Sequence, residues 1–166
     1  QACHIANHMI YGYSCFDTDY TGMGTTMVSA VALGDEVYVL NVGDSRAYRI
    51  TKRKLVQITR DHSLVQDMVD RGEISAEEAR THPRRNVITR ALGVDENVPC
   101  DIFKPRLSRG DMLLLCSDGL TNMLEDREIF ELSKHNPDPL SLGRALMAEA
   151  LERGATDNVT VVIISK

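Results

Sequence analysis

The sequence predicts an α+β fold, in which strands form antiparallel sheets and helices pack on the faces of those sheets. Strand-like runs follow one another closely between residues 25 and 58, joined by short turns that favour antiparallel neighbours over βαβ units. Helical patterns are grouped in a middle block and near the carboxyl end. The resulting order is helix, antiparallel strands, helical insert, strands, helix and strand.

The amino-terminal segment predicts a helix followed by a loop. Residues 2–11 fit a helix that carries Ile5, Met9 and Ile10 on one side. Residues 12–24 are polar and rich in glycine, so a loop is expected there.

Four strands are expected next, at residues 25–33, 36–42, 46–50 and 55–58. The Gly34-Asp35 pair between the first two strands is a tight-turn signal. In the second strand, Val37 and Val39 fall on one face by alternation, and Asn41 is an open third member of that face. The short connections predict that successive strands pair as an antiparallel meander.

The middle of the chain changes to charged, helical sequence over residues 61–93. Ser75 and Glu78 have the spacing of a capping box, which marks the start of a short helix that Pro83 must stop. An earlier helix, capped by Gly72, is predicted by apolar residues at helical spacing: Leu64, Val65, Met68 and Val69. Because this block has few core residues, we expect it to be a surface subdomain inserted between strands.

The carboxyl-terminal third returns to strands and one long helix. Residues 101–116 have strand character, and the run at 112–116 is expected to be the most buried. Asp138, followed by proline, marks a helix start, and Gly154 closes that helix. The inward stripe of the helix is predicted to be Leu142, Ala145, Leu146, Ala150 and Leu151. A continuous apolar strand is expected over residues 159–164.

The composition is typical of one soluble globular domain, which we expect to comprise residues 1–166. The chain is 43% hydrophobic and 26% charged, and it has a net charge of −5. No basic cluster favours nucleic-acid binding, and no apolar run is long enough to span a membrane. The four cysteines show no CxxC spacing, which argues against a zinc ribbon and fits inert thiols in a reducing, cytoplasmic compartment.

Three aspartates stand beside small turn-forming residues at the ends of apolar strands: Asp44, Asp118 and Asp157. Strand ends bring side chains to a shared edge, where three carboxylates would repel one another. A divalent cation would offset this repulsion, and oxygen ligands select Mg²⁺ or Mn²⁺ over Zn²⁺. Alternatively, each aspartate caps a turn, as Asp-Gly and Asp-Asn pairs commonly do. The residues alone leave both interpretations open.

Six segments resemble the sequence blocks of one protein family: GMGTT (22–26), NVGDSRAY (41–48), TRDHSL (59–64), NVITRALG (86–93), CSDGL (116–120) and ATDNVT (155–160). The family is that of the metal-dependent PP2C-type (PPM) serine/threonine protein phosphatases, in their bacterial form. The blocks occur in family order and span nearly the whole chain. The resemblance implies two packed antiparallel β-sheets flanked by helices, an α-β-β-α sandwich with a metal cluster at one edge.

The resemblance also implies roles for single residues. Asp118 matches the metal-binding aspartate of the family's Ser-Asp-Gly motif, and Asp157 matches that of its Asp-Asn motif. Asp44 matches the aspartate of Gly-Asp-Ser-Arg, which in family members helps to hold a third, weaker metal together with the residue at Asp118. Residues 61–93 match the mobile flap beside the active site.

Three further residues have weaker assignments. Arg84 and Arg85 belong to the flap, where they either steer an acidic phosphorylated substrate near the site or form a plain solvated pair. His62 stands between an aspartate and a serine, but the resemblance implies that this block is structural and not a catalytic triad.

The implied chemistry is hydrolysis of phosphoserine and phosphothreonine monoesters by a metal-activated water. Two Mn²⁺ or Mg²⁺ ions, with a third as an option, lower the pKa of that water and orient it toward phosphorus. No covalent phosphoenzyme is needed, so we expect Cys116 to be a core residue and not a nucleophile. The expected partners are phosphorylated proteins, modified by an opposing serine/threonine kinase.

The family pattern begins upstream of Gln1, and its catalytic arginine and metal-bridging aspartate have no counterpart in this chain. Gly22-Met23-Gly24 follows a threonine where the bridging block would have aspartate, so it matches a later Gly-Thr-Thr block. The chain also begins with neither methionine nor a signal-peptide pattern. We therefore expect a partial domain that lacks its amino-terminal strands, an incomplete catalytic fragment. The alternative is a catalytically inactive phosphatase-like module for binding or regulation.

Overall fold

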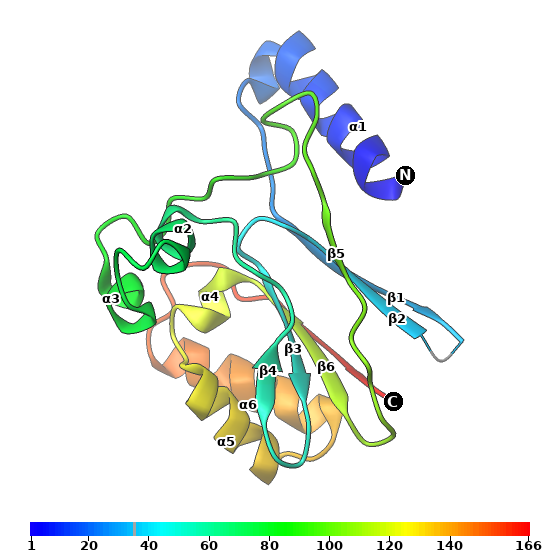
Figure 1. The fold of residues 1–166 in the computed structure, drawn as a ribbon, viewed down its shortest axis with the longest axis vertical. Helices are drawn as coiled ribbons and strands as arrows, with labels where there is room; N and C mark the ends of the chain where they lie inside the picture. Colours follow the sequence, from blue (N-terminus) through cyan, green and yellow to red (C-terminus); the bar gives the residue numbers. More distant parts are fainter. Residues whose placement is uncertain (35) are drawn as a thin grey trace. The chain divides into compact units, whose positions relative to one another are not determined.

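The computed structural model describes residues 1–34 and 36–166, so the Asp35 half of the expected Gly34-Asp35 turn lies outside the described residues. Figure 1 shows the order of the elements. The helices are α1 (Ala2–Phe16), the 3₁₀ helix η1 (Thr18–Tyr20), α2 (Leu64–Asp70), α3 (Ala76–Thr81), α4 (Asp118–Thr121), α5 (Asp126–His135) and α6 (Pro139–Glu152). The strands are β1 (Met27–Leu33), β2 (Glu36–Val42), β3 (Arg46–Ile50), β4 (Leu55–Gln57), β5 (Asp101–Phe103), β6 (Met112–Cys116) and β7 (Val161–Ser165).

The strands form two sheets, and the predicted α+β class is confirmed. One sheet has three strands in the order β1-β2-β5, and the other has four in the order β4-β3-β6-β7. All three neighbouring pairs of the four-stranded sheet are antiparallel.

The predicted meander is wrong at the step from β2 to β3, because these two strands belong to different sheets. The chain leaves β2 at Gly43, whose φ of 105° lies in the region that favours glycine. A Cβ at this position would lie 2.4 Å from Cγ2 of Thr26. Gly43 therefore turns the chain tightly against Thr26, and β3 pairs with β4 and β6 instead.

The chain divides into two compact units. The first unit comprises Gln1–Met27, Leu40–Asp44 and Arg60–Ile102. The second unit comprises Val28–Val39, Ser45–Thr59 and Phe103–Lys166. Each unit has its own buried apolar residues.

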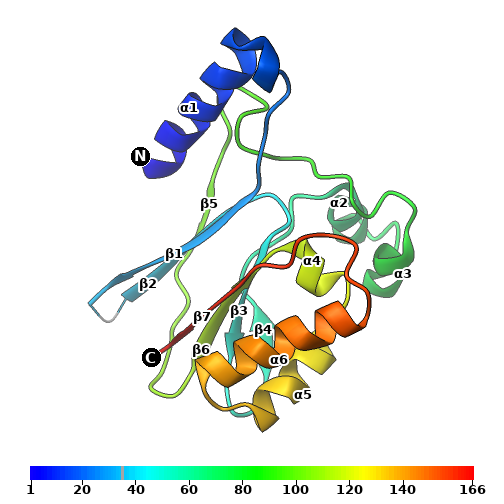
Figure 2. The same ribbon diagram turned by 180° about the vertical axis from the view of Figure 1, so that it is seen from behind.

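In the second unit, β6 is buried on both faces, which explains its uninterrupted apolar sequence. Leu113 and Leu115 pack in one cluster with apolar residues of β1 and β2. Leu114 belongs to the opposite cluster, which includes buried residues of α5 and α6. Figure 2 shows these two helices on one face of the four-stranded sheet. The expectation that residues 112–116 would be the most buried run is confirmed.

β7 shows that an apolar run need not be buried on both faces. This strand begins at Val161, two residues later than expected, and it forms an edge of its sheet. Ile163 packs against the α5 and α6 side, whereas Val162 and Ile164 are 47% and 45% exposed. The side chains alternate between the two faces because β7 is a regular strand.

α6 begins as predicted at Asp138, whose side chain accepts a hydrogen bond from the Ser141 N–H at 2.9 Å. Three members of the predicted stripe are fully buried: Leu142, Leu146 and Ala150. The prediction for Leu151 is wrong, because this residue is 63% exposed. Each residue turns the helix by about 100°, so the step from Ala150 to Leu151 leaves the buried stripe.

α5 has no counterpart among the predicted elements. Its capping box uses Glu125 as the capping residue and Glu128 as its partner, so the usual serine or threonine signal is missing. Ile129 is nevertheless fully buried in the same cluster as α6. Packing against α6 and the sheet therefore stabilises a helix whose first-turn sequence does not predict it.

In the first unit, α1 confirms the amino-terminal helix but corrects its length and its buried face. The helix continues through residues 12–16, which were expected in a loop. Ile5 and Met9 are 61% and 60% exposed, so the predicted face is wrong. The apolar cluster of this unit instead includes Cys3, Ala6 and Ile10 of α1.

A buried asparagine accounts for this orientation of α1. Asn7 is 1% exposed, and its Nδ2 donates to the carbonyl oxygens of Asp95 and Glu96 at 3.0 and 2.9 Å. Its Oδ1 accepts a hydrogen bond from the Gly93 N–H at 2.8 Å. A polar residue satisfied in this way can be buried, and it turns Ile5 and Met9 outward.

The helices of residues 61–93 confirm the predicted capping box and add a cap at Ser63 that was not predicted. Ser63 caps α2 by accepting from the Gln66 N–H, and Ser75 and Glu78 form the complete capping box of α3. That this segment is a flap subdomain of a single domain stays a prediction. Within the described parts of the chain, no helix combines the length and the apolar character needed to cross a membrane.

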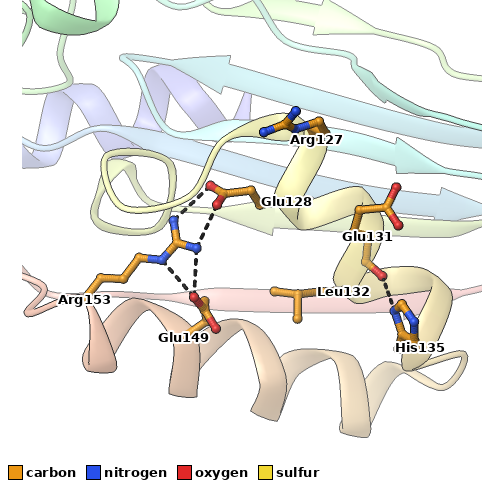
Figure 3. Close-up of a pocket in the computed structure, with 7 residues that line it drawn as sticks. All are labelled: Arg127, Glu128, Glu131, Leu132, His135, Glu149 and Arg153. Carbon is orange, nitrogen blue, oxygen red and sulfur yellow. Dashed lines mark hydrogen bonds and ion pairs between the residues drawn. The ribbon is translucent and has the colours of Figure 1, made fainter.

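An ion-pair network ties α5 to α6 in the second unit (Figure 3). Arg153 donates from Nη1 and Nη2 to the two carboxylate oxygens of Glu128, at 2.9 and 2.7 Å. Its Nε also donates to Glu149 at 2.8 Å. These residues line a groove of about 510 Å³ between the two helices. The hydrogen bonds from Arg153 and from the Glu125 backbone lower the pKa of Glu128 to about 2.

This pairing predicts a pH-dependent contribution to stability. The folded pKa of Glu128 lies below its unfolded value of about 4.3, so the stabilisation is present above that pH and is lost as the pH falls toward 2. We expect Glu128→Gln to lower the free energy of unfolding by about 1 kcal/mol at pH 7, since both partners are partly exposed. Urea unfolding at pH 7, 5 and 3 measures the difference.

The matched control is Glu152→Gln, at the exposed end of α6, which should change the stability by less than about 0.5 kcal/mol. A deficit of Glu128→Gln that stays constant down to pH 3 would contradict the assignment to the ion pair.

Candidate metal centre

The end of β6 leads directly into the CSDG motif. Ser117 is the capping residue of α4, and Asp118 is the first residue of that short helix. The Asp118 side chain is partly buried, and its Oδ2 accepts a hydrogen bond from Asn122 Nδ2 at 3.2 Å. The buried strand therefore delivers a carboxylate to the end of the sheet without enclosing it in the core.

The ATDNVT motif meets the CSDG motif at this end of the sheet. The Ser117 N–H donates to the Thr160 oxygen at 3.1 Å, and the Thr160 N–H donates to Ser117 Oγ at 3.0 Å. Ser117 Oγ in turn donates to the Asn158 oxygen at 3.2 Å. These bonds continue the pairing of β6 and β7, and they tie together the two segments that carry Asp118 and Asp157.

The donor chemistry of these two carboxylates fits a hard divalent cation. Asp157 is exposed, and its Oδ1 accepts from the Asn158 N–H at 2.7 Å. Across residues 1–34 and 36–166, neither Asp157 nor Asp118 has a lysine or arginine partner. The described residues contain no group of three or more potential metal ligands. Carboxylate oxygens such as those of Asp118 and Asp157 are the ligand type that Mg²⁺ or Mn²⁺ takes, and their role as metal ligands stays a prediction.

Gly119 is required for the close approach of the two motifs. A Cβ at this position would lie 2.4 Å from the backbone oxygen of Asn158. We expect Gly119→Ala to lower the free energy of unfolding by about 2–3 kcal/mol, because the Asn158 segment must move away. Urea unfolding measures this loss, and a Mn²⁺ titration should show weaker binding.

Gly143→Ala in α6 is the matched control, since its Cβ would find its nearest neighbour at 3.8 Å. This change should be neutral or stabilising, because alanine is a better helix former than glycine. Equal stability of the two variants would show that the approach at Gly119 is not as tight as the geometry indicates.

Asp44, the third predicted ligand, belongs to the first unit, where it follows Gly43. The backbone of Gly43 pairs with His62: the His62 N–H donates to the Gly43 oxygen at 3.0 Å, and the Gly43 N–H donates to His62 Nδ1 at 3.0 Å. The resemblance assigned His62 no functional role. The DHS triplet around it is the one sequence signal that marks it, and its partners become visible only in the structure.

Two charged residues complete the surroundings of His62. Its Nε2 lies 3.1 Å from Asp101 Oδ2, and Arg90 Nη1 donates to Asp101 Oδ1 at 2.9 Å. Partial burial raises the pKa of Asp101, but the hydrogen bonds from His62 and Arg90 outweigh it, so the pKa lies below its usual value. Asp101 therefore stays a carboxylate at neutral pH.

Arg84 and Arg85 are exposed in a turn that follows α3 in the first unit. Their backbone N–H groups donate to Nδ1 and to the carbonyl oxygen of His82, respectively. Neither side chain has an ion-pair partner among the residues that the structure describes. Both guanidinium groups are thus available to solvent, and their place beside the active site stays a prediction.

The motifs and their geometry agree with a family comparison. The family profile described as protein phosphatase 2C matches residues 12–152. The chain belongs to the protein phosphatase 2C family. The resemblance carried by the six motifs is thereby confirmed.

Bacterial proteins are similar to this PP2C chain along nearly its whole length. The serine/threonine phosphatase Stp of Listeria monocytogenes serotype 4b is 42% identical over 160 residues, which are 96% of this chain and 64% of that protein. The serine/threonine protein phosphatase PstP of Mycobacterium tuberculosis is 38% identical over 98% of this chain and 31% of that protein. This chain therefore spans about two thirds or less of the length of these relatives.

Solved structures confirm the sandwich of two antiparallel sheets flanked by helices. The crystal structure of Stp1 from Staphylococcus aureus matches with a TM-score of 0.95 at 43% identity, over 99% of this chain and 65% of that one. The catalytic domain of PstP in complex with two manganese ions matches with a TM-score of 0.84 at 36% identity, over 95% and 65% of the two chains.

Proposed function

We propose that this chain carries part of the catalytic machinery of a metal-dependent protein phosphatase that hydrolyses phosphoserine and phosphothreonine monoesters. The observation that carries the proposal is the hydrogen-bonded meeting of the CSDG and ATDNVT segments through Ser117. Two aspartates of the PP2C motifs lie on these joined segments. Membership of the protein phosphatase 2C family and the names of the bacterial relatives support the reaction class.

Asp118 and Asp157 are the residues that would hold a divalent ion in the second unit, and Asp44 stays a predicted ligand in the first. Mn²⁺ or Mg²⁺ suits such oxygen donors, and the manganese ions in the PstP structure support this choice. A third ion, held with the help of Asp44, remains a prediction. When bound, the ions supply a water of lowered pKa and positive charge beside the phosphoryl oxygens.

The contribution of this chain is to hold its carboxylates in fixed positions. The buried strand β6 and the bonds of Ser117 restrict the backbone immediately before Asp118. The reaction consumes one water and releases inorganic phosphate and the serine or threonine hydroxyl. Cys116 is 2% exposed within an apolar cluster, which supports its assignment as a core residue and not a nucleophile.

The proposed partners are phosphorylated proteins whose modification an opposing serine/threonine kinase introduces. The exposed guanidinium groups of Arg84 and Arg85 support a role for residues 61–93 in binding an acidic, phosphorylated substrate. A cytoplasmic location is part of the proposal, and the four cysteines, which are free in the structure, support a reducing compartment.

One observation favours the second candidate, a catalytically inactive phosphatase-like module. The described residues hold no group of three potential metal ligands, whereas a catalytic centre with two ions needs several carboxylates. The chain would then bind a metal ion or a phosphorylated protein without turnover.

The test is phosphate release from a phosphothreonine peptide by the purified chain, with Mn²⁺ and with a chelator. Release that requires Mn²⁺ and exceeds release from the matching phosphotyrosine peptide supports the phosphatase. Mn²⁺ binding, measured by electron paramagnetic resonance, without any release excludes turnover by this chain alone, as expected of an incomplete catalytic fragment or of the inactive module.

A further inference from the structure

His62 is a buried histidine whose ring nitrogens and backbone polar groups all have hydrogen-bond partners. Its side chain is 2% exposed, and both its ring nitrogens have partners in the first unit. Its backbone is also paired on both sides, with the N–H donating to Gly43 and the carbonyl oxygen accepting from Thr89 at 2.8 Å. The ring is therefore held in one orientation.

The hydrogen bonds define the tautomer of this ring. The Gly43 N–H points at Nδ1, so Nδ1 is an acceptor and carries no proton. The neutral ring then has its proton on Nε2, which donates to Asp101 Oδ2 at 3.1 Å. Arg90 Nη1, which lies 3.0 Å from Nε2, directs its hydrogen bond to the other oxygen of Asp101.

The turn at Gly43 depends on this ring. Gly43 has a φ of 105° and packs against Thr26 with no room for a Cβ. Its N–H is buried and is satisfied by His62 Nδ1. An unsatisfied buried N–H costs about 1–3 kcal/mol, so loss of this acceptor would favour another path for the turn. Asp44 is the next residue, and its carboxylate would move with the backbone.

We propose that His62 is a positioning residue, which fixes the Gly43 turn through Nδ1 and so places the Asp44 carboxylate for a divalent metal ion. This inference rests on the proposed function, because it takes Asp44 as a metal ligand. Asp101 holds the ring in the required tautomer, and Arg90 holds Asp101. Substituting a residue that holds a metal ligand in place typically lowers the metal affinity by about 10- to 100-fold.

The test separates the two ring nitrogens by substitution. In His62→Asn, the side-chain oxygen takes the place of Nδ1 and can accept from the Gly43 N–H. In His62→Gln, the polar end reaches the place of Nε2, and the acceptor for Gly43 is lost. We expect Mn²⁺ binding by the full chain to weaken about 10-fold or more in His62→Gln, and to stay within about 3-fold of the original in His62→Asn.

Two further measurements tie the effect to the turn and to Asp44. In the unsubstituted chain, a scalar coupling between the Gly43 nitrogen and His62 Nδ1 should be detectable by ¹⁵N NMR. Asp44→Asn should weaken Mn²⁺ binding as much as His62→Gln does, and the double variant should show no additional loss. Urea unfolding of the Asn and Gln variants controls for a general loss of stability.

The proposal is overturned if His62→Gln binds Mn²⁺ as tightly as the unsubstituted chain, or if the Asn and Gln variants lose equal affinity. Additive losses in the double variant would also overturn it. If the chain binds Mn²⁺ with the expected ranking of variants but releases no phosphate, His62 keeps its role, and turnover by this chain alone is excluded. If the chain releases phosphate with Mn²⁺ but the His62 variants bind Mn²⁺ with equal affinity, the phosphatase proposal stands and the proposed role of His62 is rejected.

Discussion

Replacing Asp118 with asparagine should weaken Mn²⁺ binding by this chain by about 100-fold and reduce Mn²⁺-dependent phosphate release by at least as much. The amide keeps the shape of the side chain and can still bond to Asn122, but it removes the negative charge that attracts the cation. The backbone bonds of Ser117 do not involve the carboxylate, so the fold should be unchanged. A Mn²⁺ titration followed by electron paramagnetic resonance measures the affinity.

The control for this substitution is Asp138→Asn, which makes the same change in net charge at the cap of α6. Asparagine caps a helix about as well as aspartate does, so stability and Mn²⁺ affinity should both be retained. If the two variants bind Mn²⁺ equally well, Asp118 is not a metal ligand. Binding measured in this way is informative whether or not the chain releases phosphate.

Replacing Leu114 with alanine should lower the free energy of unfolding by about 3–4 kcal/mol. Leu114 is fully buried at the centre of the four-stranded sheet, where it pairs with Tyr48 of β3 and Ile163 of β7. Neighbouring strands and the helices above them cannot close the cavity that the missing atoms leave, because they are held by their own backbone bonds and packing. Urea unfolding followed by circular dichroism measures the loss.

Ile164→Ala on β7 is the matched control, because Ile164 is 45% exposed on the same sheet. We expect it to cost less than about 1 kcal/mol, since little apolar surface returns to water. An equal loss of unfolding free energy in the two variants would mean that Ile164 is buried in solution, which would contradict its exposure in the structure.

Local signals were sufficient to predict the helix starts at Ser75 and Asp138. Both side chains accept a hydrogen bond from a backbone N–H three residues further along, so all the atoms involved lie in one short segment. α5 escaped prediction because Glu125, an uncommon capping residue, stands at its start. Its stability depends on burial of Ile129 against elements distant in the sequence.

The sequence predicts the candidate metal ligands from their motifs, but it does not predict the hydrogen bonds that hold the backbone around them. Asp118 and Asp157 follow from motifs that resemble one family. Asp118 lies just after the end of β6 as predicted, whereas Asp157 lies in the turn before β7, which begins only at Val161. The bonds of Ser117 to the ATDNVT segment join residues about 40 positions apart, which no local pattern specifies. The same applies to His62, whose ring finds Asp101 at a separation of 39 residues.

The sequence by itself determined the local elements of this chain and the identity of its acidic motifs, because capping, strand propensity and motif spacing act within a few residues. The tertiary structure decided which strands become neighbours and which face of each helix is buried. β3 left the sheet of β2 because Gly43 adopts a positive φ against Thr26. α1 turns Ile5 and Met9 outward because Asn7 finds three backbone partners about 90 residues away. At these positions, burial and long-range hydrogen bonds stabilise the structure more than the local preferences indicated by hydrophobic spacing do.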